Sequence, residues 1–102
     1  MHLATFLVNN LIRMGIQIIK RSGLKEPYYQ DKIERVVVAA GLKPKEGKLL
    51  AENITAWIKN LGQNEITSED VRNKVSGELA KVNRFAKNAY DWYEKSKDTN
   101  GS

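Results

Sequence analysis

Two residue types that often carry chemistry are scarce in this chain of 102 residues, which has no cysteine and a single histidine, His2. Without cysteine, disulfide bonds, thiolate metal sites and cysteine nucleophiles are excluded. His2 lies beside a chain terminus, where side chains are usually mobile and solvated. Metal sites built on histidines and catalysis through a histidine base therefore lack their usual residues. We predict no catalytic residue, no metal site and no enzymatic activity.

The chain also lacks a long hydrophobic run. Its most apolar stretch, Leu3 to Ile19, is interrupted by polar residues well short of the length that spans a bilayer. No basic residue precedes its first apolar run, so the stretch does not resemble a signal peptide. We expect a cytoplasmic protein that makes no membrane contact.

A β-hairpin is predicted near the start of the chain. The segment Ile16 to Lys20 partly alternates and is rich in isoleucine, which is typical of a strand. A turn follows at Ser22 and Gly23, since glycine tolerates positive φ. Leu24 to Tyr29 can return as a second strand, in which Pro27 is compatible only with a sheet edge or with the end of the strand.

About four helices are predicted after the hairpin, because the hydrophobic period changes from two residues to about 3.6. Two of their boundaries are set by glycines and two by residues that cap helices well. The boundary residues are Asp31 and Gly41 for the first helix, Pro44 and Gly62 for the second, Thr67 or Ser68 at the start of the third, and Asn83 at the start of the fourth. The alternative is that the third and fourth helices run together with a bend.

The predicted fold is α+β and mostly α, with a short N-terminal β-hairpin capping a bundle of about four helices. Trp57, Phe85 and Trp92 fall at helical spacing beside aliphatic residues, so we assign them to the core rather than to base stacking or a cofactor. The domain is expected to cover residues 14–95. Residues 1–13 are an extension compatible with a short helix, and the polar residues 96–102 are expected to form a disordered tail.

The positive charge is concentrated in one part of the sequence. The formal net charge is +5, and residues 13–48 contain nine basic residues against four acidic ones, whereas the remainder is balanced. Lys20 and Arg21 end the first predicted strand, and Lys32 lies near the start of the first predicted helix. These side chains can converge at one end of the hairpin, where several cations beside helix N-terminal N–H groups would hold a polyphosphate. A solvated basic surface is the alternative.

Several segments together resemble a known family. They are Ile18-Ile19-Lys20-Arg21-Ser22-Gly23, then Glu26-Pro27-Tyr28 and Asp31-Lys32-Ile33, then Ile66 to Val71, and finally Phe85 to Tyr93. Their order and spacing over residues 15–95 resemble the ATP-cone, a regulatory nucleotide-binding module of ribonucleotide reductases, of a repressor of reductase genes and of some kinases. The resemblance implies a stand-alone module that binds ATP or dATP, with Mg²⁺ as a possible companion.

The resemblance also implies a set of binding residues. Lys20 and Arg21 would face the phosphates together with Lys32 and the adjacent Ile33, and Glu26 would lie near the base or ribose. The remaining positions that match nucleotide-binding positions of the family are Ser68, Arg72 and Lys95. The sequence departs from the family's usual pattern at Ser22, Tyr29, Arg72 and Glu94, which bears on nucleotide choice and on whether binding is retained.

Three functions follow from these residues. The first is nucleotide-dependent regulation through a separate protein partner or through a homo-oligomer. In the second, a small basic protein binds nucleic acid without sensing nucleotides, with Tyr28 and Tyr29 stacking on bases. The third is a degenerate ATP-cone that acts only as a protein-interaction module.

Overall fold

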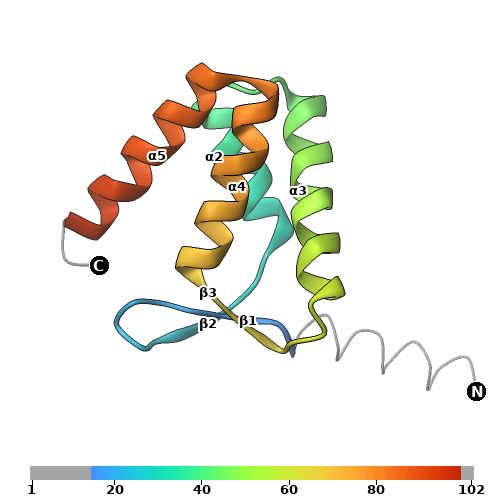
Figure 1. Cartoon of the computed structure of the whole chain (residues 1–102), viewed down its shortest axis with the longest axis vertical. Coiled ribbons are helices and arrows are strands. Elements are labelled where there is room, and N and C mark those ends of the chain that lie inside the picture. Colours follow the sequence, from blue (N-terminus) through green and yellow to red (C-terminus); the bar gives the residue numbers. More distant parts are fainter. Residues whose placement is uncertain (1–14, 100–102) are drawn as a thin grey trace, which may run out of the picture.

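The computed structural model describes residues 15–99, so the extension expected at residues 1–13 and the last three residues lie outside the described range. Within that range three short strands and four helices form an α+β fold, as predicted (Figure 1). Their bounds are β1 (Gln17–Ile19), β2 (Lys25–Pro27), α2 (Gln30–Ala40), α3 (Pro44–Asn60), β3 (Glu65–Thr67), α4 (Ser68–Val82) and α5 (Arg84–Thr99).

The predicted hairpin is part of a three-stranded sheet in the order β2-β1-β3. Strand β1 pairs antiparallel with β2 and parallel with β3, and β2, α2 and α3 lie between the two parallel strands in the sequence. The sequence analysis missed β3. That strand has three residues, of which only Ile66 is buried, so it is too short to show a periodic pattern.

The helix boundaries agree with the sequence signals. Gly41, at φ 136°, ends α2, and Pro44 is the first residue of α3. Thr67 rather than Ser68 is the N-cap of α4, since its hydroxyl accepts a hydrogen bond of 3.1 Å from the backbone N–H of Asp70. Asn83 separates α4 from α5, and its side-chain oxygen accepts a hydrogen bond of 3.1 Å from the N–H of Ala86.

The core lies between one face of the sheet and the inward stripes of the helices. Its most deeply buried large side chains are Ile54, Ile58, Leu79, Val37 and Val75. Ile18 and Ile66 from neighbouring strands join the same cluster. The sheet thus forms a floor beneath the helix bundle, and the hairpin projects beyond it on the side of α5 (Figure 1).

The expected core role of Phe85 and Trp92 is wrong. Their side chains are 79% and 71% exposed, whereas Ala86 and Tyr90 of the same helix are buried. Helix α5 has two apolar stripes, and the stripe of Ala86 and Tyr90 faces inward, where α5 packs against α4 and α2. Trp57, the third aromatic residue assigned to the core, is partly buried against it.

The C-terminal boundary also differs from the expectation. Helix α5 continues to Thr99, so residues 96–99 are helical rather than part of a disordered tail. Among the described residues no helix combines the length and the apolar character needed to cross a bilayer.

Candidate functional site

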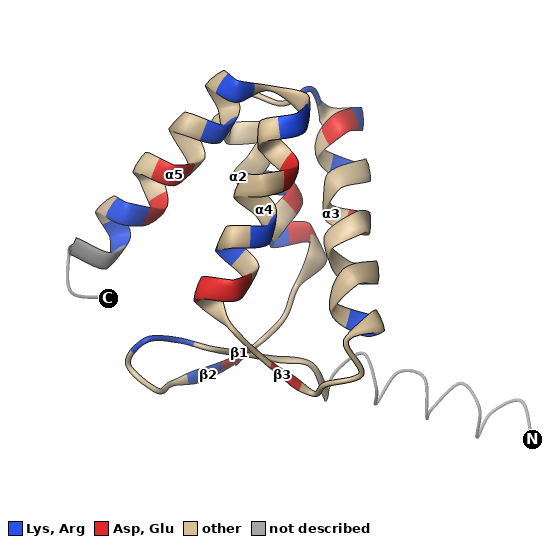
Figure 2. Ribbon diagram, in the orientation of Figure 1, with Lys and Arg blue, Asp and Glu red and all other residues tan. Residues whose placement is uncertain are grey.

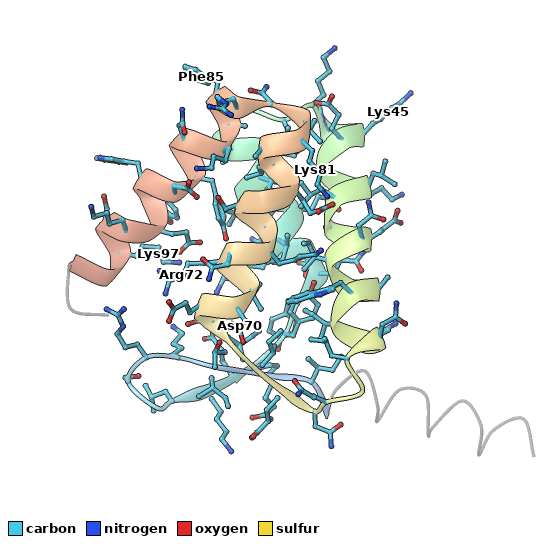
Figure 3. All side chains as sticks on the ribbon, in the orientation of Figure 1. Lys45, Asp70, Arg72, Lys81, Phe85 and Lys97 are labelled. Atoms are coloured by element: carbon cyan, nitrogen blue, oxygen red, sulfur yellow. The ribbon has the colours of Figure 1, made fainter. Side chains whose placement is uncertain are left out.

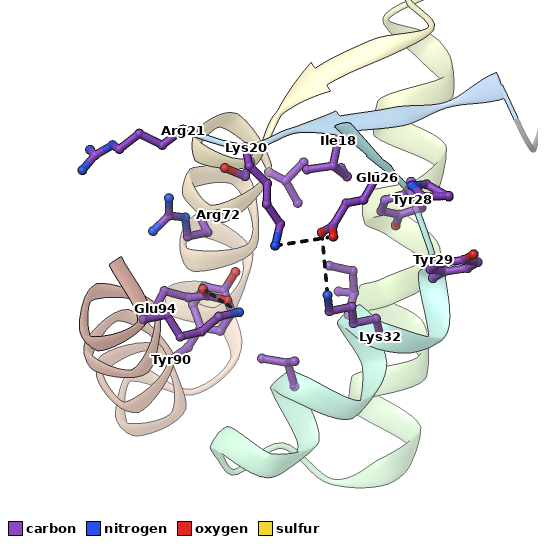
Figure 4. A pocket seen from close by; sticks show the side chains of 16 residues that line it. Ile18, Lys20, Arg21, Glu26, Tyr28, Tyr29, Lys32, Arg72, Tyr90 and Glu94 are labelled. Atoms are coloured by element: carbon purple, nitrogen blue, oxygen red, sulfur yellow. Dashed lines mark ion pairs between the residues drawn. The ribbon is translucent and has the colours of Figure 1, made fainter. Parts of the chain in front are cut away.

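A cleft opens between the hairpin, the first turns of α2 and α4, and the C-terminal half of α5 (Figure 4). Seven of the eight predicted binding residues line it. They are Lys20, Arg21, Glu26, Lys32, Ile33, Ser68 and Arg72. The elements that supply them are far apart in the sequence, so the cleft exists only in the folded chain.

Strand geometry directs Lys20 and Glu26 into the cleft. Glu26 is the register partner of the buried Ile18 on the neighbouring strand, so both side chains point to the helix side of the sheet. Lys20 follows Ile18 by two residues and shares its face. Lys25, one residue from Glu26, instead pairs with Glu65 on the opposite face, at 2.5 Å.

Glu26 bridges two lysines that come from different elements. Its carboxylate lies 3.4 Å from the Nζ of Lys20 and 3.8 Å from the Nζ of Lys32 (Figure 4). All three side chains are between 38% and 51% exposed, so water screens these ion pairs and each is weak. The lysines can therefore exchange this carboxylate for another anion at little cost.

The parallel pairing of β1 with β3 brings the start of α4 to the cleft. The carboxyl ends of parallel strands lie at the same edge of a sheet, so Ser68, which follows β3, lies near Lys20, which follows β1. Arg72 lies one helical turn after Ser68 on α4 and lines the same cleft. This edge thus combines basic side chains with a helix N-terminus, a combination that favours anions.

Helix α5 contributes Tyr90 and Lys97, which the sequence analysis did not assign to the site, and Glu94, which it named only as a departure from the family's pattern. Tyr90, Glu94 and Lys97 line the cleft, and the Nζ of Lys97 lies 3.5 Å from the carboxylate of Glu94. Burial raises the pKa of Tyr90, and the neighbouring charge of Glu94 raises it further. Figure 3 labels Arg72 and Lys97, which both line the cleft, where α4 and α5 diverge. Tyr90, Glu94 and Lys97 are spaced so that they share one face of a helix. The sequence analysis instead assigned Phe85 and Trp92, on another face, to the core.

Lys95 is the predicted residue that does not line the cleft. It lines a neighbouring pocket between α4 and α5, together with Arg21, Arg72 and Asp91. Arg21 and Arg72 belong to both pockets, so the two are adjacent. Burial raises the pKa of Asp91, but hydrogen bonds from Lys87 and Ser76 lower it more, and the net pKa is lowered.

The cleft is both basic and apolar. Five basic side chains and two acidic ones line it, and basic residues mark the hairpin and the C-terminal half of α5 in Figure 2. Behind them lies an apolar wall made of Ile18, Ile33, Val36, Val71 and the ring of Tyr90. A ligand that suits this cleft carries several negative charges at one end and an apolar surface at the other.

The same order of elements is found in a known family. The ATP cone domain matches residues 16–98. The chain belongs to the ATP-cone family. The family resemblance seen in the sequence is therefore confirmed, and with it the expected fold of a small sheet and a mostly helical bundle. Domains of this family are nucleotide-binding regulatory modules.

A curated relative supports the assignment. The chain is similar to the transcriptional repressor NrdR of Bdellovibrio bacteriovorus, with 33% identity over 73 residues. The match covers 68% of this chain but 38% of the relative. The ATP-cone chain described here therefore spans well under half the length of that repressor.

Proposed function

We propose that this ATP-cone binds one adenine nucleoside triphosphate, ATP or dATP, in the cleft and does not hydrolyse it. The observation that carries the proposal is the convergence of Lys20, Lys32 and Arg72 from three different elements on one apolar wall. A nucleoside triphosphate matches both parts, since it joins a polyanion to a planar, largely apolar base.

The phosphates are assigned to the hairpin side of the cleft. Lys20, Arg21 and Lys32 provide charge there, and Arg72 provides a planar guanidinium that can bind two phosphate oxygens at once. The first turn of α4 lies at the same edge, and its backbone N–H groups favour negative charge. We assign Ser68, the first residue of that turn, to the phosphate contacts.

The adenosine end is assigned to the apolar wall around Ile33 and Tyr90. Glu26 lines the same cleft, where its carboxylate can accept hydrogen bonds from the ribose or the base. Lys95, in the adjacent pocket, is assigned to the end of the phosphate chain that extends toward Arg21.

The cleft suits binding better than catalysis. Its two acidic side chains, Glu26 and Glu94, already face lysines at 3.4 to 3.8 Å. Mg²⁺ that enters with the triphosphate is therefore expected to be held by phosphates and water, with no set of carboxylates dedicated to it.

Regulation follows from the position of the cleft. A ligand that contacts both the hairpin and α5 favours the arrangement of these two elements that it binds most tightly. Occupancy can then change the surface offered to a separate protein partner or to another copy of the chain. The size of that effect is limited by the difference in nucleotide affinity between the two arrangements.

Direct nucleic-acid binding is the second candidate function, because one relative is a transcriptional repressor. The basic hairpin could contact a phosphate backbone, in which case affinity would fall steeply with salt. Nucleotide binding is favoured because the lysines lie beside a concave apolar wall, which a DNA backbone does not require.

Isothermal titration calorimetry tests the proposal. Saturable binding of ATP or dATP near one nucleotide per chain is expected, with a loss of about tenfold or more for Lys20→Ala and Lys32→Ala, since each removes a charge-assisted contact. Lys45→Ala is the matched control, because Lys45 is an exposed lysine at the far end of the bundle (Figure 3). Equal losses in all three variants, or salt-dependent DNA binding without nucleotide binding, would count against the proposal.

A further inference from the structure

The helix bundle carries a second basic surface at the end opposite the cleft. Helices α2 and α4 run from the sheet to this end, and α3 and α5 begin there, so the α2–α3 and α4–α5 connections lie together (Figure 1). A Cβ built on Gly41, in the first connection, would lie 3.6 Å from the Cβ of Ala86 in the first turn of α5. Six basic residues on these connections and the adjoining helix turns form what we call the distal basic patch. They are Lys43, Lys45, Lys48, Lys81, Arg84 and Lys87 (Figure 2).

Carboxylates compensate only part of this charge. Glu78 pairs with Lys81 at 3.0 Å, and Asp91 pairs with Lys87 at 2.7 Å. Glu46, the acidic residue in the first turn of α3, accepts a backbone hydrogen bond of 3.0 Å that caps that helix. Among the described residues no carboxylate forms an ion pair with the three other exposed cations, which are Lys45, Lys48 and Arg84. The patch therefore keeps a positive excess that an anionic partner can neutralise.

An exposed aromatic ring lies within the patch. Phe85, the second residue of α5, is 79% exposed, and its side chain points away from the bundle in Figure 3. Arg84 precedes it directly, and Val82, at the end of α4, is also exposed. The first turn of α5 carries no acidic residue, so cations and an aromatic face are presented together to solvent.

We propose that the distal basic patch binds single-stranded nucleic acid. Phosphates of the strand lie along the lysines and Arg84, and an unpaired base stacks on the ring of Phe85. Cations beside an exposed ring are the two elements with which proteins bind single strands without sequence preference. A duplex would use the cations alone, because its bases are already stacked on one another. The exposed ring therefore favours a single strand over a duplex.

The patch is separate from the nucleotide cleft. Helix α4 has 15 residues and begins at the cleft, so its length places the patch about 20 Å away. That distance exceeds the Debye length of about 8 Å at physiological ionic strength, so charges at one end have little effect at the other. This binding site thus differs from the basic hairpin considered above, and it does not rest on the proposed function. One chain can hold a nucleotide and a nucleic acid at the same time.

Fluorescence anisotropy of the full chain with a labelled oligothymidylate of about 16 nucleotides, over a salt series, tests the proposal. Saturable binding is expected, with the logarithm of affinity falling by about 0.7 per contacted phosphate for each tenfold rise in salt. Lys45→Ala and Arg84→Ala should each weaken binding and reduce that slope by about 0.7. Phe85→Ala should weaken binding about fivefold or more at an unchanged slope, because stacking releases no counterions.

Matched variants at the other end of the molecule identify the surface. Lys20→Ala removes a cation and Tyr29→Ala removes a ring that is 58% exposed, both from the hairpin end, and neither should weaken oligonucleotide binding. Losses in these two variants, with full binding by Lys45→Ala and Phe85→Ala, would place the strand on the hairpin and overturn the proposal. Wild-type chain that binds no oligonucleotide would also overturn it, as would binding only to a duplex or only to anionic lipid vesicles.

Calorimetry with ATP separates this proposal from the proposed function. Lys45→Ala and Phe85→Ala should bind ATP as the wild-type chain does, since both positions lie far from the cleft. A wild-type chain that binds the oligonucleotide but not ATP would count against the proposed function alone. A chain that binds ATP but no oligonucleotide would count against the distal basic patch alone.

Discussion

The carboxylate of Glu26 lies 3.4 Å from the ammonium group of Lys20, across the two strands of the hairpin. It also lies 3.8 Å from the ammonium group of Lys32 on α2. The cleft therefore has an anion of its own that faces two of its cations. On the proposed function a polyphosphate competes with this carboxylate, so we predict that Glu26 influences both the affinity and the selectivity of binding.

Glu26→Gln is expected to affect the binding of inorganic triphosphate and of ATP differently. Exposed ion pairs are worth about 0.2–1 kcal/mol each, so removal of two should tighten the binding of inorganic triphosphate by roughly twofold to thirtyfold. ATP should gain less or weaken, because the carboxylate is assigned to the ribose or base. Titration calorimetry with both ligands measures the difference.

Glu65→Gln is the control for this experiment. Glu65 also pairs with a lysine, Lys25, but on the opposite face of the sheet, so its neutralisation changes the net charge equally. If both variants tightened inorganic triphosphate by the same factor, the effect would come from overall charge and not from the bridge in the cleft.

A hydrogen bond of the Tyr28 hydroxyl group links the end of the hairpin to α3. It lies 2.8 Å from the Oγ1 of Thr55, which itself donates a hydrogen bond to the carbonyl of Ala51 at 3.1 Å. Since Thr55 has one hydroxyl hydrogen, Tyr28 is the donor in the first bond. Tyr28→Phe should lower the free energy of unfolding by about 1 kcal/mol in urea denaturation. Tyr29→Phe, at a residue 58% exposed, should change it little.

Stability is expected to fall at alkaline pH because Tyr90 is buried and Tyr28 is partly buried. Burial raises the pKa of Tyr90 and of Tyr28 above the ordinary value of 10.0, although the hydrogen bond with Thr55 partly lowers that of Tyr28. The folded state thus keeps protons that the unfolded state releases, so the contribution is complete below pH 10 and is lost above it. Each tyrosine can add about 1.4 kcal/mol per pH unit to the slope.

Urea denaturation between about pH 8 and pH 11 measures that slope, a range that brackets the ordinary tyrosine pKa. Tyr90→Phe should make the decline shallower, whereas Tyr29→Phe should leave it unchanged. A slope that is identical in all three proteins would show that lysine deprotonation, and not the buried tyrosine, governs alkaline unfolding.

Substitution by alanine is expected to have opposite effects on stability at two glycines inside helices. A Cβ at the buried Gly47 of α3 would lie 2.5 Å from a methyl group of Val38 on α2. Gly47→Ala should therefore destabilise the protein by about 1–3 kcal/mol, despite the better helix propensity of alanine. A Cβ at Gly77 of α4 meets no atom within 4 Å, so Gly77→Ala should stabilise by roughly 0.5–1 kcal/mol. Chemical denaturation of both variants tests the close approach of α2 and α3, and a stabilised Gly47→Ala would contradict it.

The helices and the hairpin were predictable because their signals are local. Helix caps such as Asn83 and helix-ending residues such as Gly41 act on their immediate neighbours in the sequence. The spacing of hydrophobic residues indicates which face of a helix can be buried. The succession of short motifs was also sufficient to recognise the ATP-cone, and seven of the eight residues taken from that resemblance line one cleft.

Tertiary structure decided what local signals could not. On α5 two stripes were available for burial, and the packing against α2 and α4 buries Ala86 and Tyr90 and leaves Phe85 and Trp92 exposed. Strand β3 forms because it pairs in parallel with β1, and that pairing places Ser68 near Lys20. Sequence by itself determined which segments fold locally, because capping and periodicity involve near neighbours. Which faces meet, and hence the cleft and the distal basic patch, depends on contacts between residues far apart in the chain.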